Sequence, residues 1–160
     1  MKKPYTVFLS ATKRDKELAQ DLAERLQAVE GVRVLFAEDM SAKGQNFSTQ
    51  VVQGLSESDE VVFLVTENAL NNQWLNYEAG AAEGLEKMIT PILVGVEPER
   101  VPSVLNDWQS LKWSRVKDYV EQLQQRVAAK LESELTKKQA PTQTLRKATT
   151  LKKSGLNPSV

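Results

Sequence analysis

The run EVVFLV at residues 60–65 is the most hydrophobic stretch of the sequence and is expected to form the central strand of a sheet. Four other short runs are also predicted strands: YTVFLS (5–10), VRVLF (32–36), ITPILV (89–94) and SLKW (110–113). Of these, YTVFLS fits a strand buried on both faces, as in a parallel sheet. Segments with helical periodicity separate these runs. The alternation predicts an α/β fold, a five-stranded parallel sheet with helices on both faces, in which residues 60–65 form the central strand.

Four helices are predicted between and after these strands, at residues 16–29, 47–56, from about 73 to 85, and 115–135. Asp15 is a suitable N-cap for the first helix, and Gly31 ends it. In the second helix, Val51, Val52 and Leu55 are expected to point inward. Pro91 lacks a backbone donor, so its strand is expected at or near an edge of the sheet, or bulged there.

The 160 residues and the hydrophobic content of 41% fit one packed domain, which we place at residues 1–135. Residues 136–160 are basic, contain no acid, and are predicted to be a flexible, disordered tail or linker. Lys+Arg and Asp+Glu are both 21, so the net charge gives no general argument for nucleic acid. The basic tail could contact nucleic acid or an acidic partner, but a solvated linker is the favoured interpretation.

The chain contains no Cys and no His, which excludes disulfides, Cys nucleophiles, Ser-His-Asp triads and ordinary zinc sites. We expect no metal site and no cofactor. No apolar run approaches the roughly 20 residues of a membrane span, and the N-terminal run is too short for a signal peptide. The expected location is cytoplasmic, without a membrane partner.

The stretch NQWLNYEAGAAEGL at residues 72–85 combines an indole, a carboxylate and several small residues on one helix. Trp74 and Glu78 are four residues apart and should share a face of it. The small residues after Glu78, including Gly80, would let another backbone approach closely. This pattern suggests a carboxylate at the edge of a tight pocket. The plain alternative is an amphipathic helix with one solvated Glu.

In a parallel α/β sheet, ligands bind beyond the carboxyl ends of the strands. The loops at that edge are residues 10–15, 37–46 and 66–73, and the helix that carries Trp74 begins there. The second loop is ten residues long, which exceeds the usual strand-to-helix connection and favours a functional role. The fold therefore brings Glu78 near the loop at residues 37–46.

The sequence resembles the Toll/interleukin receptor (TIR) domains from about residue 5 to residue 131. The matching stretches are VFLSATKRDKELAQDLAERL, AEDMSAKGQNF, EVVFLVTENAL, WLNYEAGAA, ITPILVGV and SLKW. WLNYEAGAA is most similar to bacterial members. The resemblance implies the flavodoxin-like TIR fold.

In catalytic TIR domains, a Glu four residues after a Trp at this place is needed to cleave nicotinamide from NAD+. The resemblance therefore implies that Glu78 is catalytic and that Trp74 belongs to the site. It also implies a nucleotide pocket lined by the first loop and the second loop; we name Ser10, Ala11, Thr12 and Arg14 from the first, and Asp39, Lys43 and Gly44 from the second. The family often has an aromatic or small polar residue at the place of Ala11. Without the resemblance, Arg14, Asp39 and Lys43 read equally well as ordinary loop charges.

The implied activity is that of an NAD+ nucleosidase that releases nicotinamide and leaves ADP-ribose or a cyclic ADP-ribose. NAD+ is then the substrate rather than a cofactor. A bacterial enzyme of this type would serve antiphage defence or act as a toxin. Family members often require self-association, so the expected partners are other copies of the chain through TIR–TIR contacts, and a sensor or effector protein.

Two other functions fit the sequence. The chain could be a non-catalytic interaction module that signals through TIR–TIR contacts, with residues 37–46 as an interface; changes at Met40 or Lys43 would then abolish function and Glu78→Gln would not. It could also be a related doubly wound enzyme, such as a nucleoside deoxyribosyltransferase, which also uses a Glu at a glycosidic bond.

Overall fold

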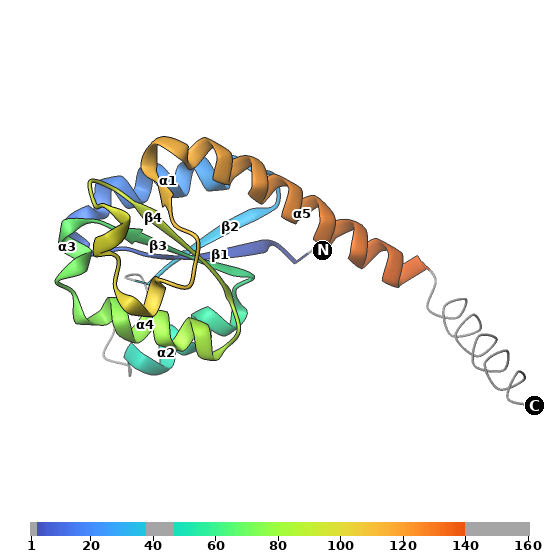
Figure 1. The fold of residues 1–160 in the computed structure, drawn as a ribbon. Coiled ribbons are helices and arrows are strands. Elements are labelled where there is room, and N and C mark those ends of the chain that lie inside the picture. Colours follow the sequence, from blue (N-terminus) through green and yellow to red (C-terminus); the bar gives the residue numbers. More distant parts are fainter. Residues whose placement is uncertain (1–2, 38–46, 140–160) are drawn as a thin grey trace, which may run out of the picture. The chain divides into compact units, whose positions relative to one another are not determined.

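The computed structural model describes residues 3–37 and 47–139 and contains a five-stranded parallel sheet in the order β2-β1-β3-β4-β5 (Figure 1). The strands are β1 (Tyr5–Ser10), β2 (Val32–Phe36), β3 (Glu60–Val65), β4 (Met88–Leu93) and β5 (Leu111–Lys112). This is the flavodoxin-like order, and β3 is its central strand. The predicted fold class is confirmed.

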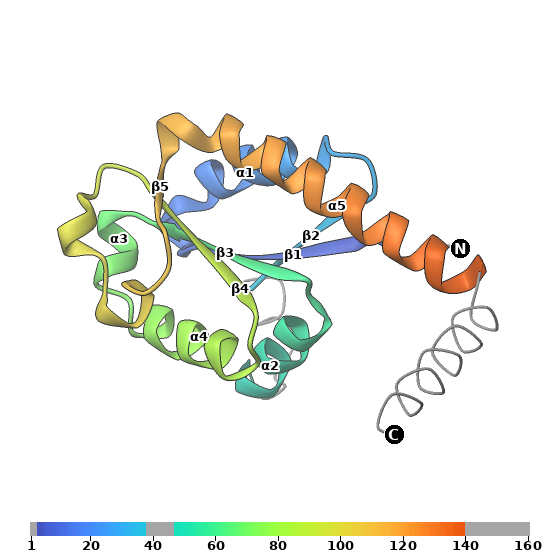
Figure 2. The ribbon, with the colours of Figure 1, turned by 45° about the vertical axis from the view of Figure 1, so that its right-hand side comes forward.

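Within the described ranges, five α-helices connect or follow these strands: α1 (Lys16–Gln27), α2 (Phe47–Glu57), α3 (Glu67–Leu70), α4 (Gln73–Gly84) and α5 (Val116–Gln139). Short 3-10 turns add η1 (Lys13–Asp15), η3 (Pro98–Arg100), η4 (Ser103–Leu105) and η5 (Trp113–Arg115). Figures 1 and 2 show α1 and the start of α5 on one face of the sheet and α2 and α4 on the other. The predicted helices therefore all form, with ends that differ by a few residues.

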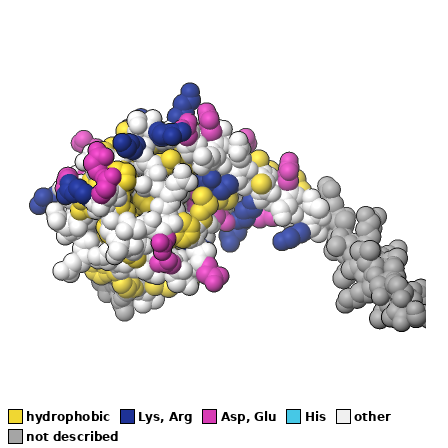
Figure 3. Space-filling view, in the orientation of Figure 1, with side chains coloured by type: hydrophobic (Ala, Val, Ile, Leu, Met, Phe, Trp, Pro, Cys, Tyr) yellow, Lys and Arg dark blue, Asp and Glu magenta, His cyan; other side chains and the backbone are white. Residues whose placement is uncertain are grey.

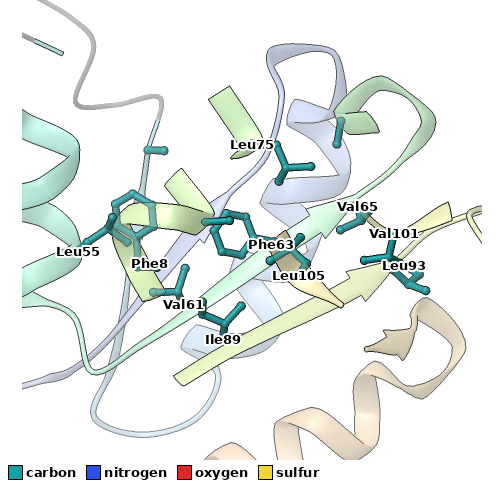
Figure 4. Close-up of a cluster of buried hydrophobic side chains, with 14 of the residues drawn as sticks. Phe8, Leu55, Val61, Phe63, Val65, Leu75, Ile89, Leu93, Val101 and Leu105 are labelled. Carbon is teal, nitrogen blue, oxygen red and sulfur yellow. The ribbon is translucent and has the colours of Figure 1, made fainter. Parts of the chain in front are cut away.

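A cluster of buried hydrophobic residues lies between the sheet and the layer that contains α2 and α4 (Figure 4). Phe8 of β1 and Val61, Phe63 and Val65 of β3 belong to it. Side chains alternate between the two faces of a strand, so Ser10 points to the same face as Phe8. The last residue of β1 therefore presents its hydroxyl to the layer of α4.

Val52 departs from the predicted inward pattern of α2. Val51 and Leu55 are fully buried, as predicted, whereas Val52 is one of the exposed large hydrophobic residues. Adjacent residues on a helix lie about 100° apart, so Val51 and Val52 cannot both face the sheet. The prediction for Val52 is wrong.

Pro91 lies in β4, between β3 and β5 and opposite Phe63, so β4 is not an edge strand of the whole sheet. However, β5 has only two residues and pairs with Ile92 and Leu93. Beside Pro91, β4 therefore has an open edge on that side, where a missing N–H breaks no sheet hydrogen bond. The expectation that the strand of Pro91 lies near an edge is therefore correct at Pro91 itself, although not for the whole of β4.

The chain divides into two compact units, residues 1–124 and 125–160, and the boundary falls within α5. In the first unit, Val116, Tyr119 and Leu123 of α5 are buried. In the second, Leu131 and Leu135 are exposed. The predicted tail starts at residue 136, but α5 continues to Gln139 and residues 140–160 lie outside the described residues. The boundary at residue 135 stays a prediction.

Candidate active site

Glu78 occupies a position on the buried face of α4. The buried residues of this helix are Leu75, Glu78, Ala79 and Ala82, which follow the i, i+3, i+4, i+7 spacing of a core-facing stripe. Glu78 is only 5% exposed, so a carboxylate stands where an amphipathic helix normally places an apolar side chain. The alternative of a solvated Glu is therefore wrong.

The small residues after Glu78 divide between two faces of α4. Ala79 and Ala82 are fully buried against the core cluster, as expected for a close helix–sheet contact. Gly80 is exposed, and a Cβ atom added to it would meet nothing within 4 Å. The expectation of a close backbone approach thus fails at Gly80, because it lies on the solvent side of the helix.

Ser10 contacts Glu78 across the gap between β1 and α4. Its hydroxyl donates a hydrogen bond to Oε2 of Glu78, and both side chains are buried. This is the only hydrogen bond to the Glu78 carboxylate from the residues that the structure describes. The second oxygen, Oε1, is thus left without a donor from the described part of the chain.

Burial raises the pKa of Glu78 to about 7, and the hydrogen bond from Ser10 opposes this rise in part. Removing a carboxylate from water disfavours its charged form, whereas a donated hydrogen bond favours it. Near neutral pH this group therefore exchanges between its acid and its base form. Carboxyl groups with this property are typical of functional sites.

A second buried carboxylate, Glu60, has a different environment. It lies at the start of β3, and the hydroxyls of Tyr5 and Tyr119 donate hydrogen bonds to it. Ligands bind at the carboxyl ends of parallel strands, whereas Glu60 is at an amino end. We therefore assign Glu60 to the packing of β1, β3 and α5, and Glu78 to the candidate site.

Trp74 lies at the start of α4, where Asn72 caps the helix by accepting a hydrogen bond from the Trp74 N–H at 3.0 Å. The indole is 46% exposed. It makes an edge-to-face contact with the ring of Tyr77, with the centroids 5.6 Å apart. The N-terminus of α4 therefore places an exposed aromatic pair beside a buried carboxylate.

The structure brings five of the predicted site residues together around one small cavity, of about 20 Å³. These are Ser10, Ala11, Thr12, Trp74 and Glu78. Sequence reasoning missed Asn72 and Leu75 as lining residues, although the cap motif and the helix spacing both mark them. Arg14 lies outside this cavity and lines a neighbouring groove. Asp39, Lys43 and Gly44 lie outside the described residues.

Asp15 was predicted to be the N-cap of the first helix, but its side chain has a different role. It occupies the N-cap position of α1 but makes no side-chain capping bond there. Its buried carboxylate instead accepts hydrogen bonds from Thr12 (2.8 Å), Thr66 (2.6 Å) and Asn68 (2.9 Å). The loops that follow β1 and β3 are thereby joined directly beside the cavity.

Three cavities meet at Thr12. The cavity of Glu78 shares Thr12, Asn72 and Trp74 with an open groove of about 660 Å³. On the other side, a cavity of about 90 Å³ lies between β1, β2 and α1 and includes Phe36 and Lys16. Small-molecule sites commonly occupy about 300–1,000 Å³. The Glu78 cavity is therefore much smaller than a nucleotide, whereas the groove beside it is not.

The described residues show three further general features. They contain no cluster of three or more side chains suited to hold a metal ion. None of their helices is both long and apolar enough to cross a membrane. On the face seen in Figure 3, basic and acidic side chains are intermingled and do not form one continuous basic patch.

Comparison with known proteins identifies relatives. A family model described as "TIR domain" matches residues 7–139. The "Probable 2' cyclic ADP-D-ribose synthase TcpO" of Methanobrevibacter olleyae is 29% identical over 77 residues. That alignment covers 48% of this chain and 23% of the relative, so the chain spans about a quarter of that protein.

Solved structures share the fold at low identity. The TIR-STING receptor of C. gigas in complex with 2',3'-cGAMP has a TM-score of 0.62 and 19% identity, over 74% of this chain and 39% of that one. The TIR domain of the Toll-related Receptor TRR-2 of Hydra magnipapillata has a TM-score of 0.56 and 18% identity, over 83% and 98%. TIR domains of the activated Roq1 resistosome have a TM-score of 0.52 and 18% identity, over 76% and 82%.

Proposed function

The chain belongs to the TIR domain family, and from its buried carboxylate we propose that it is an NAD+ nucleosidase that cleaves the nicotinamide–ribose bond. The observation that carries this proposal is Glu78, buried beside Trp74 at the ligand-binding edge of the sheet, with a pKa near neutrality. The TcpO relative is named as a probable cyclic ADP-ribose synthase, which supports NAD chemistry at the level of the family.

The chemistry requires a negative group near the anomeric carbon and little else. When the bond breaks, its electron pair leaves with the nicotinamide nitrogen, which neutralises the pyridinium ring. The ribose becomes an oxocarbenium-like centre, as in glycoside hydrolysis. The ionised Glu78 stabilises this positive charge, and such oriented electrostatic stabilisation is often the largest catalytic contribution.

The surroundings of Glu78 suit this role. Ser10 holds one carboxylate oxygen, and the other has no donor among the described residues, so it is available to the ribose. The positive pyridinium of bound NAD+ favours the ionised form of the carboxylate. Capture of the oxocarbenium by water gives ADP-ribose, whereas capture by a group of the same molecule gives a cyclic ADP-ribose. Nicotinamide is released whichever of the two products forms.

The test is incubation of NAD+ with the full chain, free in solution and clustered on beads, followed by chromatography. Nicotinamide should appear in step with the loss of NAD+, and the second product peak separates hydrolase from cyclase. If clustered and folded protein leaves NAD+ intact, the proposed function is wrong. In that case the chain acts as an interaction module, and residues 37–46 become the next target.

We further propose that the enzyme acts as a self-association-dependent toxin or defence factor. A cavity of about 20 Å³ cannot enclose a nicotinamide riboside, so the site must widen before it binds substrate. Association with another copy of the chain would supply that rearrangement. The solved Roq1 resistosome provides an example of TIR domains in an activated assembly.

Specific activity is therefore expected to rise with protein concentration rather than stay constant. The measurement is nicotinamide release per mole of chain across a wide dilution series. Bead-bound protein at low bulk concentration serves as the control and should keep the high specific activity. A constant specific activity over the whole series would contradict the need for self-association while leaving the proposed reaction intact.

The pH dependence of kcat/KM should follow the ionisation of Glu78. The pKa of this carboxyl is about 7, and its base form is the active one, so kcat/KM should fall about tenfold per pH unit below 7 and level off above it. Ser10 lowers the pKa of Glu78, so Ser10→Ala should move the inflection to higher pH. An inflection near 4.5, the ordinary value for Glu, would contradict control of the rate by a Glu78 carboxyl whose pKa is raised by burial.

A further inference from the structure

The second compact unit of the chain, residues 125–160, is described only for the C-terminal part of α5, up to Gln139. Three apolar residues of this segment, Val127, Leu131 and Leu135, follow one another at intervals of four. Leu131 is 36% exposed and Leu135 is 41% exposed, although Leu is normally a core residue. The described part of this unit is a single helix, and a helix cannot cover its own apolar face.

These three residues form a ridge along one side of the helix. At about 100° per residue, Val127 and Leu135 lie about 40° to either side of Leu131. A ridge of this i, i+4 type packs into the same kind of ridge on another helix at a crossing angle of about 50°, the commonest helix packing in globular proteins. When two copies cross at Leu131 in opposite directions, Val127 of each copy faces Leu135 of the other. The ridge is therefore complementary to itself.

The charges beside the ridge favour the same arrangement. Lys130 and Glu134 each precede a Leu of the ridge by one residue, so both lie along the same border of it. In a pairing of opposite direction, this border meets its own copy, and Lys130 of each chain comes beside Glu134 of the other. In a pairing of the same direction, the border would face Glu132 of the other copy, which repels Glu134.

We propose that the C-terminal end of α5 is a self-association surface, on which a second copy of this chain packs its own α5 end in the opposite direction. The contact is centred on Leu131 and is separate from residues 1–124, the unit that contains the sheet and the candidate site. Three apolar side chains from each copy make a small interface, so the pairing is weak and the chain is monomeric when dilute.

This pairing would bring two copies of the first unit together and raise their local concentration. It thereby names a contact that supports the self-association on which activity depends. That link to activity rests on the proposed function, whereas the pairing itself rests on the ridge and its charges.

Sedimentation analysis of the full chain over a wide concentration range tests the pairing. Wild type should form dimers as the concentration rises, and Leu131→Glu/Leu135→Glu should raise the dissociation constant at least about tenfold, because it buries like charges in the contact. The control Ala129→Glu/Ser133→Glu adds the same charge to exposed residues on the opposite side of the same helix and should dimerise as wild type does. Equal dissociation constants for the two double variants, or a wild type that stays monomeric throughout, would overturn the proposal.

The direction of the pairing can be tested by cross-linking, because the chain contains no Cys of its own. Val127→Cys and Leu135→Cys chains are mixed and oxidised, and mass spectrometry identifies the dimers. A disulfide needs Cα atoms within about 7 Å, so the mixed dimer should dominate. Ser133→Cys, on the far side of the helix, is the control and should cross-link little. A predominance of the two unmixed dimers would overturn the opposite direction.

Nicotinamide release then separates the pairing from the proposed function. Free in solution, Leu131→Glu/Leu135→Glu should lose at least about tenfold in specific activity, whereas on beads it should match wild type, since clustering replaces the pairing. Wild-type activity of the free variant would refute the link to activity and leave the reaction standing. Dimers that depend on Leu131 and Leu135, without cleavage of NAD+ by clustered wild type, would support the pairing and refute the proposed function.

Discussion

Glu78→Gln is expected to lower the rate of nicotinamide release from NAD+ by roughly 10³-fold. Loss of one electrostatic stabiliser of a transition state typically lowers kcat by about 10²–10³-fold, and Glu78 carries a full charge in a buried site. Gln has nearly the same shape and can still accept the hydrogen bond from Ser10, so the substitution removes the charge and leaves the packing of α4 in place.

Glu83→Gln is the matched control for this loss. Glu83 lies on the same helix but is exposed, so removing its charge should leave the rate within about twofold of wild type. The comparison needs both variants to be folded, which circular dichroism can verify. A Glu78→Gln protein that is folded and keeps more than about a tenth of the wild-type rate would contradict the catalytic assignment.

The same substitution is expected to stabilise the fold at alkaline pH, by about 3 kcal/mol in the free energy of unfolding at pH 8. The ordinary pKa of a Glu is 4.5, whereas burial raises that of Glu78 to about 7. Between these values the folded protein holds a proton that the unfolded chain releases. The stability that this proton contributes is fully present below pH 4.5 and is lost as the pH rises through about 7. Gln does not ionise, so its variant avoids the loss.

Urea unfolding at pH 8 and at pH 4.5 measures this difference. Glu78→Gln should exceed wild type in stability at pH 8 and differ little from it at pH 4.5, with the exposed Glu83→Gln measured as the matched control. An equal difference at both pH values would mean that packing, rather than the ionisation of Glu78, causes the change. Together with the loss of activity, the expected result would show that the buried carboxylate lowers the stability of the fold at pH 8 but is required for catalysis.

The strands could be predicted from the sequence because each is a short run rich in apolar and β-branched residues, and in β1 and β3 nearly every residue is buried, whereas β2 has one buried residue. The predicted runs at residues 5–10, 32–36 and 60–65 coincide with β1, β2 and β3. The ends of the helices were predicted less accurately, because the side-chain pattern changes gradually there while the hydrogen bonding ends abruptly. At Val52 and Gly80 the pattern could not show which side of the helix would meet the sheet.

Only part of the candidate site could be predicted from the sequence. The spacing of Trp74 and Glu78 identified the helix, but it did not show that the carboxylate is buried while the indole is exposed. The contact of Ser10 with Glu78 joins residues 68 positions apart, and no local pattern encodes it. The network around Asp15 and the groove beside Trp74 likewise depend on how β1 and β3 lie together in the sheet.

The central claim is that the Glu78 carboxylate cleaves the nicotinamide–ribose bond, and one chromatographic measurement tests it most directly. Bead-clustered wild type and bead-clustered Glu78→Gln are each incubated with NAD+, and released nicotinamide is quantified over time. We predict a growing nicotinamide peak with wild type and almost none with Glu78→Gln. Equal peaks from the two proteins, or no peak from folded wild type, would contradict the claim.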